Sequence, residues 1–491
     1  MPLRIFIAAT LVASAANPPA LKSRIDAIVA NTPAIASGFV GMRVIRLKDG
    51  HVLYERDSDH LFAPASNTKL FTTALALTTL GPEYRFKTTV LGDHGDLVVV
   101  GGGDPSLSPR HYPYEKSRSG QQTEPVETIA AIEDLADQVV AHGLQSIEGD
   151  VVGDDRRYVW DPYPDGWAVN DAIWEYGAPV SALIVNDNAF ALRIRPGAHP
   201  GDLARVLTSP SSVPLTINNR LVTTSNGERK ISVDRRIGSD ELDLWGHIPA
   251  SDNGTTELLA VDDPAVFAAA LLRDALIRRG VSVRGASIAR HRFAVEVADR
   301  KRGDSLPAIN GAELARRESP PLAELLQVVD KVSQNLHAEV MLREVGAVKR
   351  NMGTREAGEE EMRTFLSQAG IAESEYHLVD GSGLSRLTLV TPAAITKLLV
   401  HMYRSRHREQ WISLLPIAGV DGTLRNRFEG HPEASSIHAK TGTLSHVRAM
   451  SGYAQSKEYG PVAFSIVVNN SLAVAHDVTA FLDTIGLKLI E

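Results

Sequence analysis

The middle of the chain is built from short strand-like segments, and this limits the folds that the whole chain can adopt. From about residue 86 to about residue 290, runs such as DLVVVGGGD, PLTINNRLVTT and ELDLWGHI are separated by Gly, Asp and Pro. Short runs of this kind, bounded by turn residues, predict strands. We therefore expect a β-rich, largely antiparallel insertion of two subdomains at 88–290, which interrupts a second domain formed by 17–87 and 291–491.

The flanking segments supply the elements of that second, split domain. On the N-terminal side, apolar runs around an Asp49-Gly50 turn predict a strand hairpin, and a helix follows from Ser66 to Gly81. On the C-terminal side, helical patterns at 320–346, 355–370 and 391–405 precede three strand-like runs, and a last helical pattern follows at 475–487. Another helical pattern, at 263–280, falls near the end of the insertion. We expect one sheet, with its first strands from the N-terminal part and its last from the C-terminal part, flanked by helices.

Composition excludes several classes of protein. The chain has 491 residues, which predicts two or three domains, and its net charge of -8 offers no basic face for nucleic acid. It has no cysteine, so disulfides, thiolate metal sites and cysteine nucleophiles are excluded. The 16 histidines form no H-E-x-x-H motif, and neither a metal nor another cofactor is expected.

The first residues resemble a secretory signal. MPLRIFIAATLVASAA combines one arginine, a short apolar run and small residues in an A-x-A pattern, which predicts a signal peptide at 1–16. The alternative is a buried first helix. No later apolar run reaches the ~20 residues that a membrane-spanning helix needs. We expect an exported chain, with the periplasm as its compartment.

The segment PASNTKLFTTALALTTLG contains a serine and a lysine three residues apart, Ser66 and Lys69, at the start of an apolar helix. The N-terminus of a helix stabilises negative charge, and residues i and i+3 are neighbours on it. Burial lowers the pKa of a lysine, so that its neutral amine can take the proton of a serine nucleophile. The alternative is that Ser66 only caps the helix.

Two further motifs follow in the chain. Ser333 and Asn335 form S-x-N between two helical runs, where a turn could direct both side chains into one site, although a polar helix junction is the plainer interpretation. Lys440 begins K-T-G-T in a strand-like segment, where a lysine can hold a carboxylate and Gly442 lets a ligand backbone lie against the strand. The plainer interpretation is a surface lysine before a turn. Each motif is weak alone, but S-x-x-K, S-x-N and K-T-G in this order are typical of penicillin-binding proteins and class A β-lactamases.

With these motifs, the chain resembles the D-alanyl-D-alanine carboxypeptidase/endopeptidases of peptidase family S13, the DacB-like class C low-molecular-mass penicillin-binding proteins. Further stretches that carry the resemblance are GGGDPSL, GDVVGDD, VSQNLHAEVMLRE and DGSGLSR. The resemblance implies an α/β (α+β) core of the serine β-lactamase and penicillin-binding transpeptidase type, with a large insertion between S-x-x-K and S-x-N. It also implies peptidoglycan stem peptides as substrates and β-lactams as acylating inhibitors.

The resemblance also implies residue roles. Ser66 would be the acylated nucleophile, Lys69 its base, and Ser333 and Asn335 a proton relay that also holds the substrate amide. Lys440, with Thr441 and Thr443 beside Gly442, would bind the terminal carboxylate, and backbone N–H groups of Ser66 and Thr443 would form the oxyanion hole. Asp171, Tyr176 and Arg386 would line a pocket for the free amino end of the stem-peptide side chain. The plainer interpretation of Asp171 is a loop carboxylate, and of Arg386 a solvated arginine.

Three other functions remain open. A serine β-lactamase would need a second base for deacylation, and no glutamate can be assigned to that role. A serine esterase of the S-x-x-K type usually carries Y-x-N instead of S-x-N. A catalytically inert cell-wall-binding scaffold would be expected to have lost one of Ser66, Lys69, Asn335 or Lys440, and all four are present.

Overall fold

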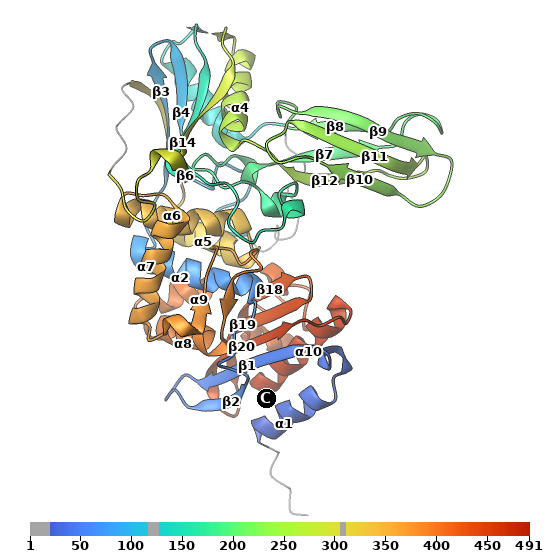
Figure 1. Cartoon of the computed structure of the whole chain (residues 1–491), viewed down its shortest axis with the longest axis vertical. Coiled ribbons are helices and arrows are strands. Elements are labelled where there is room, and N and C mark those ends of the chain that lie inside the picture. Colours follow the sequence, from blue (N-terminus) through green and yellow to red (C-terminus); the bar gives the residue numbers. More distant parts are fainter. Residues whose placement is uncertain (1–19, 116–126, 305–310) are drawn as a thin grey trace, which may run out of the picture.

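The computed structural model describes residues 20–115, 127–304 and 311–491. The expected signal peptide at 1–16 lies outside the described residues. Figure 1 shows two parts: a domain that contains both ends of the described chain, and an insertion that lies above it and extends an arm to the right.

The split domain is organised around one antiparallel sheet of five strands in the order β18-β19-β20-β1-β2. Two strands come from the N-terminal part, β1 (Phe39–Arg46) and β2 (Val52–Arg56). Three come from the C-terminal part, β18 (His438–Leu444), β19 (Val447–Ser456) and β20 (Gly460–Asn469). Strand β1 pairs along its whole length with β20, from Phe39 opposite Asn469 to Arg46 opposite Val462. The expectation of one sheet shared by the two ends of the chain is confirmed.

Helices cover both faces of this sheet (Figure 1). One face carries α1 (Leu21–Ala30) and α10 (Ala475–Ile490). The other carries α8 (Pro392–Arg404), with α2, α5, α6, α7 and α9 packed beyond it, at Thr68–Leu80, Leu322–Lys331, Asn335–Arg350, Arg355–Gln368 and Arg408–Leu414. The short strands β16 (Tyr376–His377) and β17 (Leu389–Val390) pair beside them. Helix α2 is apolar on most of its surface and is buried over Thr68–Leu77, which places the S-x-x-K motif at the centre of the domain.

The insertion contains a second five-stranded sheet in the order β14-β6-β4-β3-β15, with α3 (Ala130–Ala141) and α4 (Pro264–Arg278) packed against it. Its strands are β3 (Lys87–Asp93), β4 (Asp96–Val100), β6 (Val151–Trp160), β14 (Ser287–Phe293) and β15 (Ala312–Glu318). Strands β5 (Ser146–Ile147) and β13 (Ser282–Val283) form a separate parallel pair, and they directly precede β6 and β14 in the chain.

The arm of the insertion consists of two three-stranded sheets, β12-β7-β8 and β10-β11-β9. Its strands are β7 (Ala189–Arg195), β8 (Arg205–Ser209), β9 (Thr216–Thr224), β10 (Lys230–Asp234), β11 (Glu241–Pro249) and β12 (Thr255–Ala260). Apolar side chains of both sheets, such as Phe190 and Leu244, belong to one buried cluster. The same cluster includes side chains of the five-stranded sheet of the insertion.

Two expectations about the insertion are corrected. It is not largely antiparallel: the β12-β7-β8 sheet is antiparallel, but β4, β6 and β14 run parallel to one another and β9 runs parallel to β11. Parallel neighbours need crossover connections: α3 lies in the connection from β4 to β6, α4 in that from β6 to β14, and β10 in that from β9 to β11. The sheet also continues beyond the expected division at 290/291, because β15 pairs with β3.

The chain enters and leaves the insertion at one place. The N–H of Phe86 donates to Ser319 Oγ at 3.0 Å, the N–H of Ser319 donates to the Phe86 carbonyl at 3.0 Å, and the N–H of Leu322 donates to the Tyr84 carbonyl at 2.8 Å. The return to the split domain therefore comes at about Ser319, some way after the expected boundary.

Candidate active site

The turn that carries Ser66 is held in a strained conformation. Residues Ala65–Asn67 form a 3-10 turn before α2, and Ala65 has a positive φ of 48°. Neither Ser66 nor another side chain caps this turn or α2. Asn67 Nδ2 donates to Ser451 Oγ on β19 at 2.9 Å, which fixes the turn to the sheet. Capping therefore does not account for Ser66, and its hydroxyl is available for another contact.

Two glycines allow other segments to approach this turn closely. A Cβ on Gly442 would lie 2.6 Å from the Pro64 carbonyl oxygen, and a Cβ on Gly383 would lie 1.9 Å from the Ala65 carbonyl oxygen. Gly383 also has a positive φ of 77°, which favours glycine. We expected Gly442 to make room for a ligand backbone; in the structure it makes room for the turn that carries Ser66.

Lys69 is buried beneath Ser66 and makes three polar contacts. Its Nζ lies 3.0 Å from Ser66 Oγ, 2.7 Å from Asn335 Oδ1 and 2.7 Å from the Ser382 carbonyl oxygen. Burial lowers the pKa of Lys69 well below its ordinary value, and the charge of Lys440 lowers it further. A neutral amine has two hydrogens, which the amide and carbonyl oxygens can accept, and one lone pair, which is then left for the Ser66 hydroxyl. This arrangement suits a general base.

The S-x-N motif lies in a turn between two helices, as its spacing predicts. Helix α5 ends at Lys331, Ser333 has a positive φ of 64°, and Asn335 is the first residue of α6. The amide of Asn335 joins two parts of the protein, because its Oδ1 accepts from Lys69 and its Nδ2 donates to the Tyr176 carbonyl of the insertion at 2.8 Å. The turn thus directs both side chains of the motif into one site.

Lys440 lies on β18, the edge strand of the sheet, and is buried. Its Nζ donates to Ser333 Oγ at 2.8 Å and to the Thr441 carbonyl at 2.8 Å. Burial lowers the pKa of Lys440 to about 8, and burial raises the pKa of the neighbouring Asp330 to about 7. Lys440 is therefore a cation that can easily lose its proton, in contact with the hydroxyl of the S-x-N motif.

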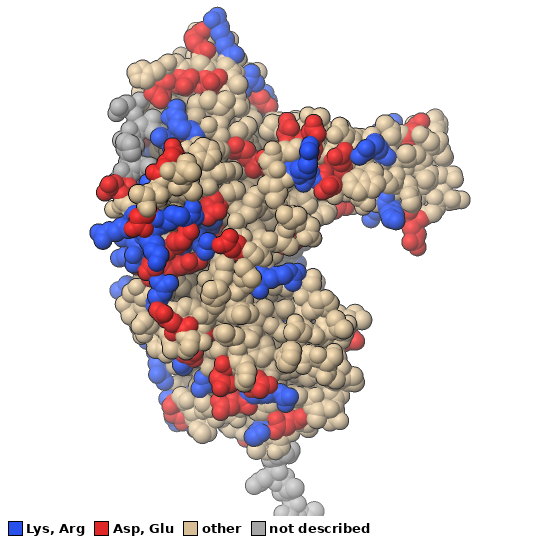
Figure 2. Space-filling view, in the orientation of Figure 1, with Lys and Arg blue, Asp and Glu red and all other residues tan. Residues whose placement is uncertain are grey.

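These groups line one cavity of about 540 Å³. Eight of the eleven expected site residues line it: Ser66, Asp171, Tyr176, Ser333, Asn335, Arg386, Thr441 and Thr443. The other three, Lys69, Lys440 and Gly442, do not. Figure 2 shows the molecule hollowed between the arm and the split domain. Within the part of the chain that the structure describes, no helix is long and apolar enough to cross a bilayer.

The insertion contributes the wall opposite β18. Asp171 and Tyr176 lie in one irregular segment, and the Tyr176 hydroxyl donates to Asp171 Oδ1 at 3.2 Å. Burial, followed by the charge of Asp171, raises the pKa of Tyr176 to about 12. Arg386 comes from the DGSGLSR loop, and its backbone N–H donates to the Gly166 carbonyl at 3.2 Å. A carboxylate, a phenol and an arginine are therefore among the residues that line the cavity.

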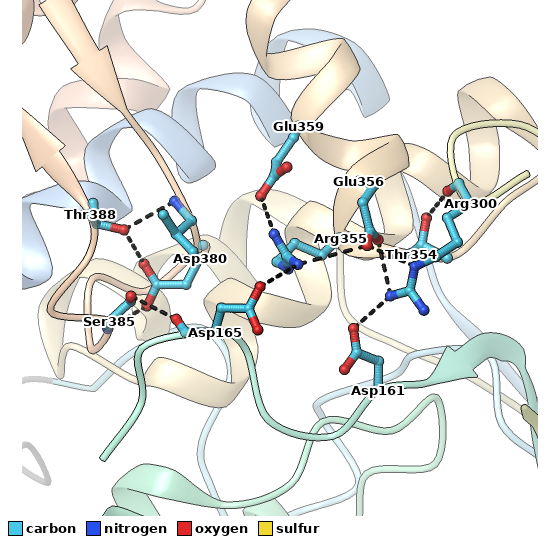
Figure 3. A network of polar contacts seen from close by, with 12 residues as sticks. Asp161, Asp165, Arg300, Thr354, Arg355, Glu356, Glu359, Asp380, Ser385 and Thr388 are labelled. Atoms are coloured by element: carbon cyan, nitrogen blue, oxygen red, sulfur yellow. Dashed lines mark hydrogen bonds and ion pairs between the residues drawn. The ribbon is translucent and has the colours of Figure 1, made fainter. Parts of the chain in front are cut away.

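Polar contacts hold the DGSGLSR loop against the insertion (Figure 3). Asp380 Oδ1 accepts from Thr388 Oγ1 at 2.8 Å, and Ser385 Oγ donates to the Asp165 carbonyl at 2.7 Å. Beside them, ion pairs join the insertion to α7, from Arg355 to Asp165 and from Arg300 to Glu356. Charged side chains of both signs gather at this junction in Figure 2. The loop is thus fixed on both of its flanks.

Sequence reasoning missed several residues of the site. Thr423 and Arg427 line the cavity, and Thr441 Oγ1 donates to Thr423 Oγ1 at 2.7 Å. Glu339 holds the segment whose carbonyl contacts Lys69. Only Glu339 has a signal in the sequence, because it follows Asn335 by four residues and so lies on the same face of a helix. The others come from loops whose positions depend on the folded chain.

The site has the groups that a serine acyl-transfer enzyme needs: a serine hydroxyl at a helix start, a buried amine in contact with it, and a second lysine–serine pair, Lys440 and Ser333. Comparison with known proteins agrees. The family model described as "D-Ala-D-Ala carboxypeptidase 3 (S13) family" matches residues 21–488. The chain belongs to this family, and it is therefore a hydrolase of the penicillin-binding protein fold.

Individual relatives cover nearly the whole chain. A D-alanyl-D-alanine carboxypeptidase of Actinomadura sp. (strain R39) is 33% identical over 98% of this chain and 86% of its own length. The D-alanyl-D-alanine carboxypeptidase DacB of Haemophilus influenzae is 24% identical, over 88% of this chain and 85% of its own length. The crystal structure of penicillin-binding protein 4 (dacB) from Haemophilus influenzae superimposes with a TM-score of 0.79 at 22% identity, covering 95% of this chain and 99% of that one. The expected core fold and family are thereby confirmed.

Proposed function

We propose that this protein is a serine DD-peptidase of peptidoglycan, in which Ser66 attacks the carbonyl of the D-Ala-D-Ala bond of a stem peptide and releases D-Ala. The observation that supports this most directly is the contact of Ser66 Oγ with the buried amine of Lys69, at 3.0 Å. The names of the relatives support the choice of peptide bond, because the Actinomadura and Haemophilus proteins are D-alanyl-D-alanine carboxypeptidases.

In the proposed acylation, the Ser66 hydroxyl gives its proton to Lys69 Nζ while its oxygen bonds to the carbonyl carbon. Negative charge then develops on the carbonyl oxygen, where the N–H groups of Ser66 and Thr443 would stabilise it. The C–N bond breaks, and the proton that Lys69 took from Ser66 passes to the leaving amine through the hydroxyl of Ser333, which Lys440 contacts, so that Lys69 is neutral again. Water later hydrolyses the ester, with Lys69 again able to accept a proton.

The edge strand β18 gives the substrate an extended surface. A strand at the edge of a sheet leaves backbone groups free to pair with a peptide. Lys440, Thr441 and Thr443 would bind the terminal carboxylate there, and Asn335 would hold the preceding amide. At the other end of the cavity, Asp171, with Tyr176 and Arg386, would receive the free amino end of the stem-peptide side chain, because a carboxylate attracts an ammonium group.

The same site would cleave cross-links between a D-Ala and a diamino acid, which contain the same type of amide bond. It would also be acylated by penicillin, which presents a reactive amide to the same serine. A crystal structure of the Haemophilus penicillin-binding protein 4 in complex with a β-lactam, which has a TM-score of 0.74 and 21% identity to this chain, is consistent with that expectation. Since the substrate lies outside the cell membrane, the proposal includes export of the chain to the periplasm.

A fluorescent penicillin tests the acylating serine. We expect a covalent band with the wild-type protein and none with Ser66→Ala or Lys69→Ala, while all three remain folded. Purified wild type should also release D-Ala from a stem peptide that ends in D-Ala-D-Ala. A wild type that forms no band and neither releases D-Ala nor cleaves cross-linked peptides would contradict the proposal and favour the inert scaffold.

The β-lactamase alternative is separated by the second step of the same reaction. A β-lactamase would lose its penicillin label within seconds and turn over nitrocefin continuously. A DD-peptidase should keep the label for minutes or longer while it continues to hydrolyse the peptide.

A further inference from the structure

The direction in which the Lys69 amine points depends on two oxygens that can only accept hydrogen bonds. These are Asn335 Oδ1 and the Ser382 carbonyl oxygen, both 2.7 Å from Lys69 Nζ. When both are in place, they take the two hydrogens of the neutral amine and leave its lone pair for Ser66. If the Ser382 carbonyl moved away, one hydrogen would be free to turn toward Ser66, and the lone pair would turn away from it.

The Ser382 carbonyl is fixed through Glu339. The carboxylate oxygen Oε1 of Glu339 accepts from the N–H of Gly381 and from the N–H of Ser382, both at 2.9 Å. Its other oxygen accepts from Arg343 Nη1 at 3.2 Å. Glu339 is fully buried, so water does not compete for these contacts. The carboxylate therefore sets the position of the segment that ends in the carbonyl on Lys69.

Other contacts hold the same loop. Asp380 Oδ2 accepts from Ser382 Oγ at 3.0 Å and from the N–H of Ser385 at 2.8 Å, and its Oδ1 accepts from Thr388 (Figure 3). Thr72 Oγ1 donates to the Gly381 carbonyl at 2.6 Å. Thr72 and Glu339 thus hold the peptide group between Gly381 and Ser382 from its two sides, and Glu339 also holds the N–H of Gly381. Glu339 itself does not line the substrate cavity.

Glu339 and Asn335 are also on one helix, α6, one turn apart. Helix α6 thus supplies one acceptor of Lys69, the Asn335 amide oxygen, and positions the other, the Ser382 carbonyl, through Glu339. A rigid helix can hold two such groups in register better than two separate loops can.

We propose that Glu339 is a positioning residue for acylation, which fixes the Ser382 carbonyl and so orients the amine of Lys69 toward Ser66. This inference rests on the proposed function, in which Lys69 is the base.

Three substitutions separate geometry from charge. Glu339→Gln keeps an oxygen at the same reach but removes the charge, and we expect its first-order acylation rate constant to stay within about 10-fold of wild type. Glu339→Asp keeps the charge, but its side chain is one carbon shorter. It should lose contact with the two N–H groups, and acylation should fall by about 100-fold, as for Glu339→Ala, since a misplacement of about 1 Å costs that much.

A matched control is Glu344→Gln on the same helix. Glu344 is also fully buried and bonded to charged and phenolic groups, Arg157 and Tyr158, but it makes no contact with the 381–382 segment. This variant should lose stability without changing the acylation rate of its folded fraction.

Because Glu339 touches no substrate, the loss in Glu339→Asp should appear in the rate constant and not in the penicillin concentration that gives half the maximal rate.

Stopped-flow acylation by fluorescent penicillin, corrected for the folded fraction, measures these effects. A Glu339→Asp protein that acylates as fast as Glu339→Gln would overturn the inference, and so would a Glu344→Gln protein with the same loss as Glu339→Asp. Both results leave wild-type acylation intact. The proposed function fails separately, if wild type itself is neither acylated nor active on the peptide.

Discussion

Gly442 of the K-T-G motif offers a direct test of how closely the turn that carries Ser66 is packed. A Cβ at this position would lie 2.6 Å from the Pro64 carbonyl oxygen and 3.2 Å from the Ala65 Cβ. Contacts under 3.0 Å are essentially never made by a Cβ, so in Gly442→Ala the turn before Ser66 must move by roughly half an ångström. Gly442 does not have a positive φ, so the effect comes from this contact and not from backbone strain.

The size of the effect follows from the displacement. Overpacking of this kind costs about 1–3 kcal/mol of folding free energy. A shift of the nucleophile by half an ångström should slow acylation by about 10-fold or more, since about 1 Å costs about 100-fold. Urea denaturation measures the first quantity, and the rate of labelling by fluorescent penicillin measures the second.

Gly92→Ala serves as the control. Gly92 lies on β3 in the insertion, and its added Cβ would meet only Leu314 Cδ1 at 3.5 Å, an ordinary contact. Stability and acylation should both stay close to wild type. The reasoning would be refuted by a Gly442→Ala protein whose folded fraction is labelled at the wild-type rate.

Three further predictions concern charges around and beyond the site. Lys440→Ala should lower kcat/KM for D-Ala-D-Ala peptides by about 100-fold or more, because it removes a buried cation from the Ser333 hydroxyl. Peptide kinetics measure this loss, and a loss under about 10-fold would argue against a role for Lys440 in the reaction. Asp187→Asn should cost about 3–5 kcal/mol in urea denaturation at pH 7, because it leaves the half-buried Arg110 and the buried His337 without their shared carboxylate. Burial opposes ionisation of Asp187, but Arg110 and His337 outweigh it and hold its pKa below 3.8, so the cost should shrink as the pH falls below about 4. Burial lowers the pKa of His291, but Asp155 and Asp263 outweigh burial and raise it to about 10, so its stabilising effect is complete below pH 6.5 and is lost as the pH rises toward 10. The stability difference between wild type and His291→Gln should therefore decrease between pH 6.5 and 10, and a difference that does not change with pH would contradict the assignment.

The sequence predicted best those features that are written in local patterns. The hairpin around Asp49-Gly50, the turn at Ser333 and the edge-strand motif at Lys440 all lie where their spacing placed them. Each depends on residues only a few positions apart, whose backbone preferences do not need the rest of the fold.

The misses have identifiable physical causes. Strand β15 has the sequence AELARRE and is mostly exposed at a sheet edge, so it lacks the apolar alternation that marks a strand, and the domain boundary was placed too early. Helix α3 does have helical spacing at Ile132, Leu135, Ala136 and Val139, but the surrounding strand-like runs obscured it. Because that helix makes a crossover, missing it also led to the wrong expectation of antiparallel strands.

The contacts within the site are the part that sequence could not supply. Lys69 meets Ser382 across 313 positions of the chain, and Asn335 meets Tyr176 across 159. Such distances are set by how the insertion and the split domain pack, which no local pattern encodes. Glu339 was within reach of helical spacing, but its partner segment was not.

The sheet shared by the two ends of the chain also orders events during synthesis. Strands β1 and β2 are made early, yet β1 has its main partner in β20, almost at the other end of the sequence. A two-stranded hairpin alone is at best marginally stable in water. At roughly 5–20 residues per second, the hairpin waits on the order of tens of seconds for β20. The insertion, which is complete at Glu318, can fold during that interval, whereas the nucleophile turn acquires its contact with Ser451 only after nearly the whole chain has been made.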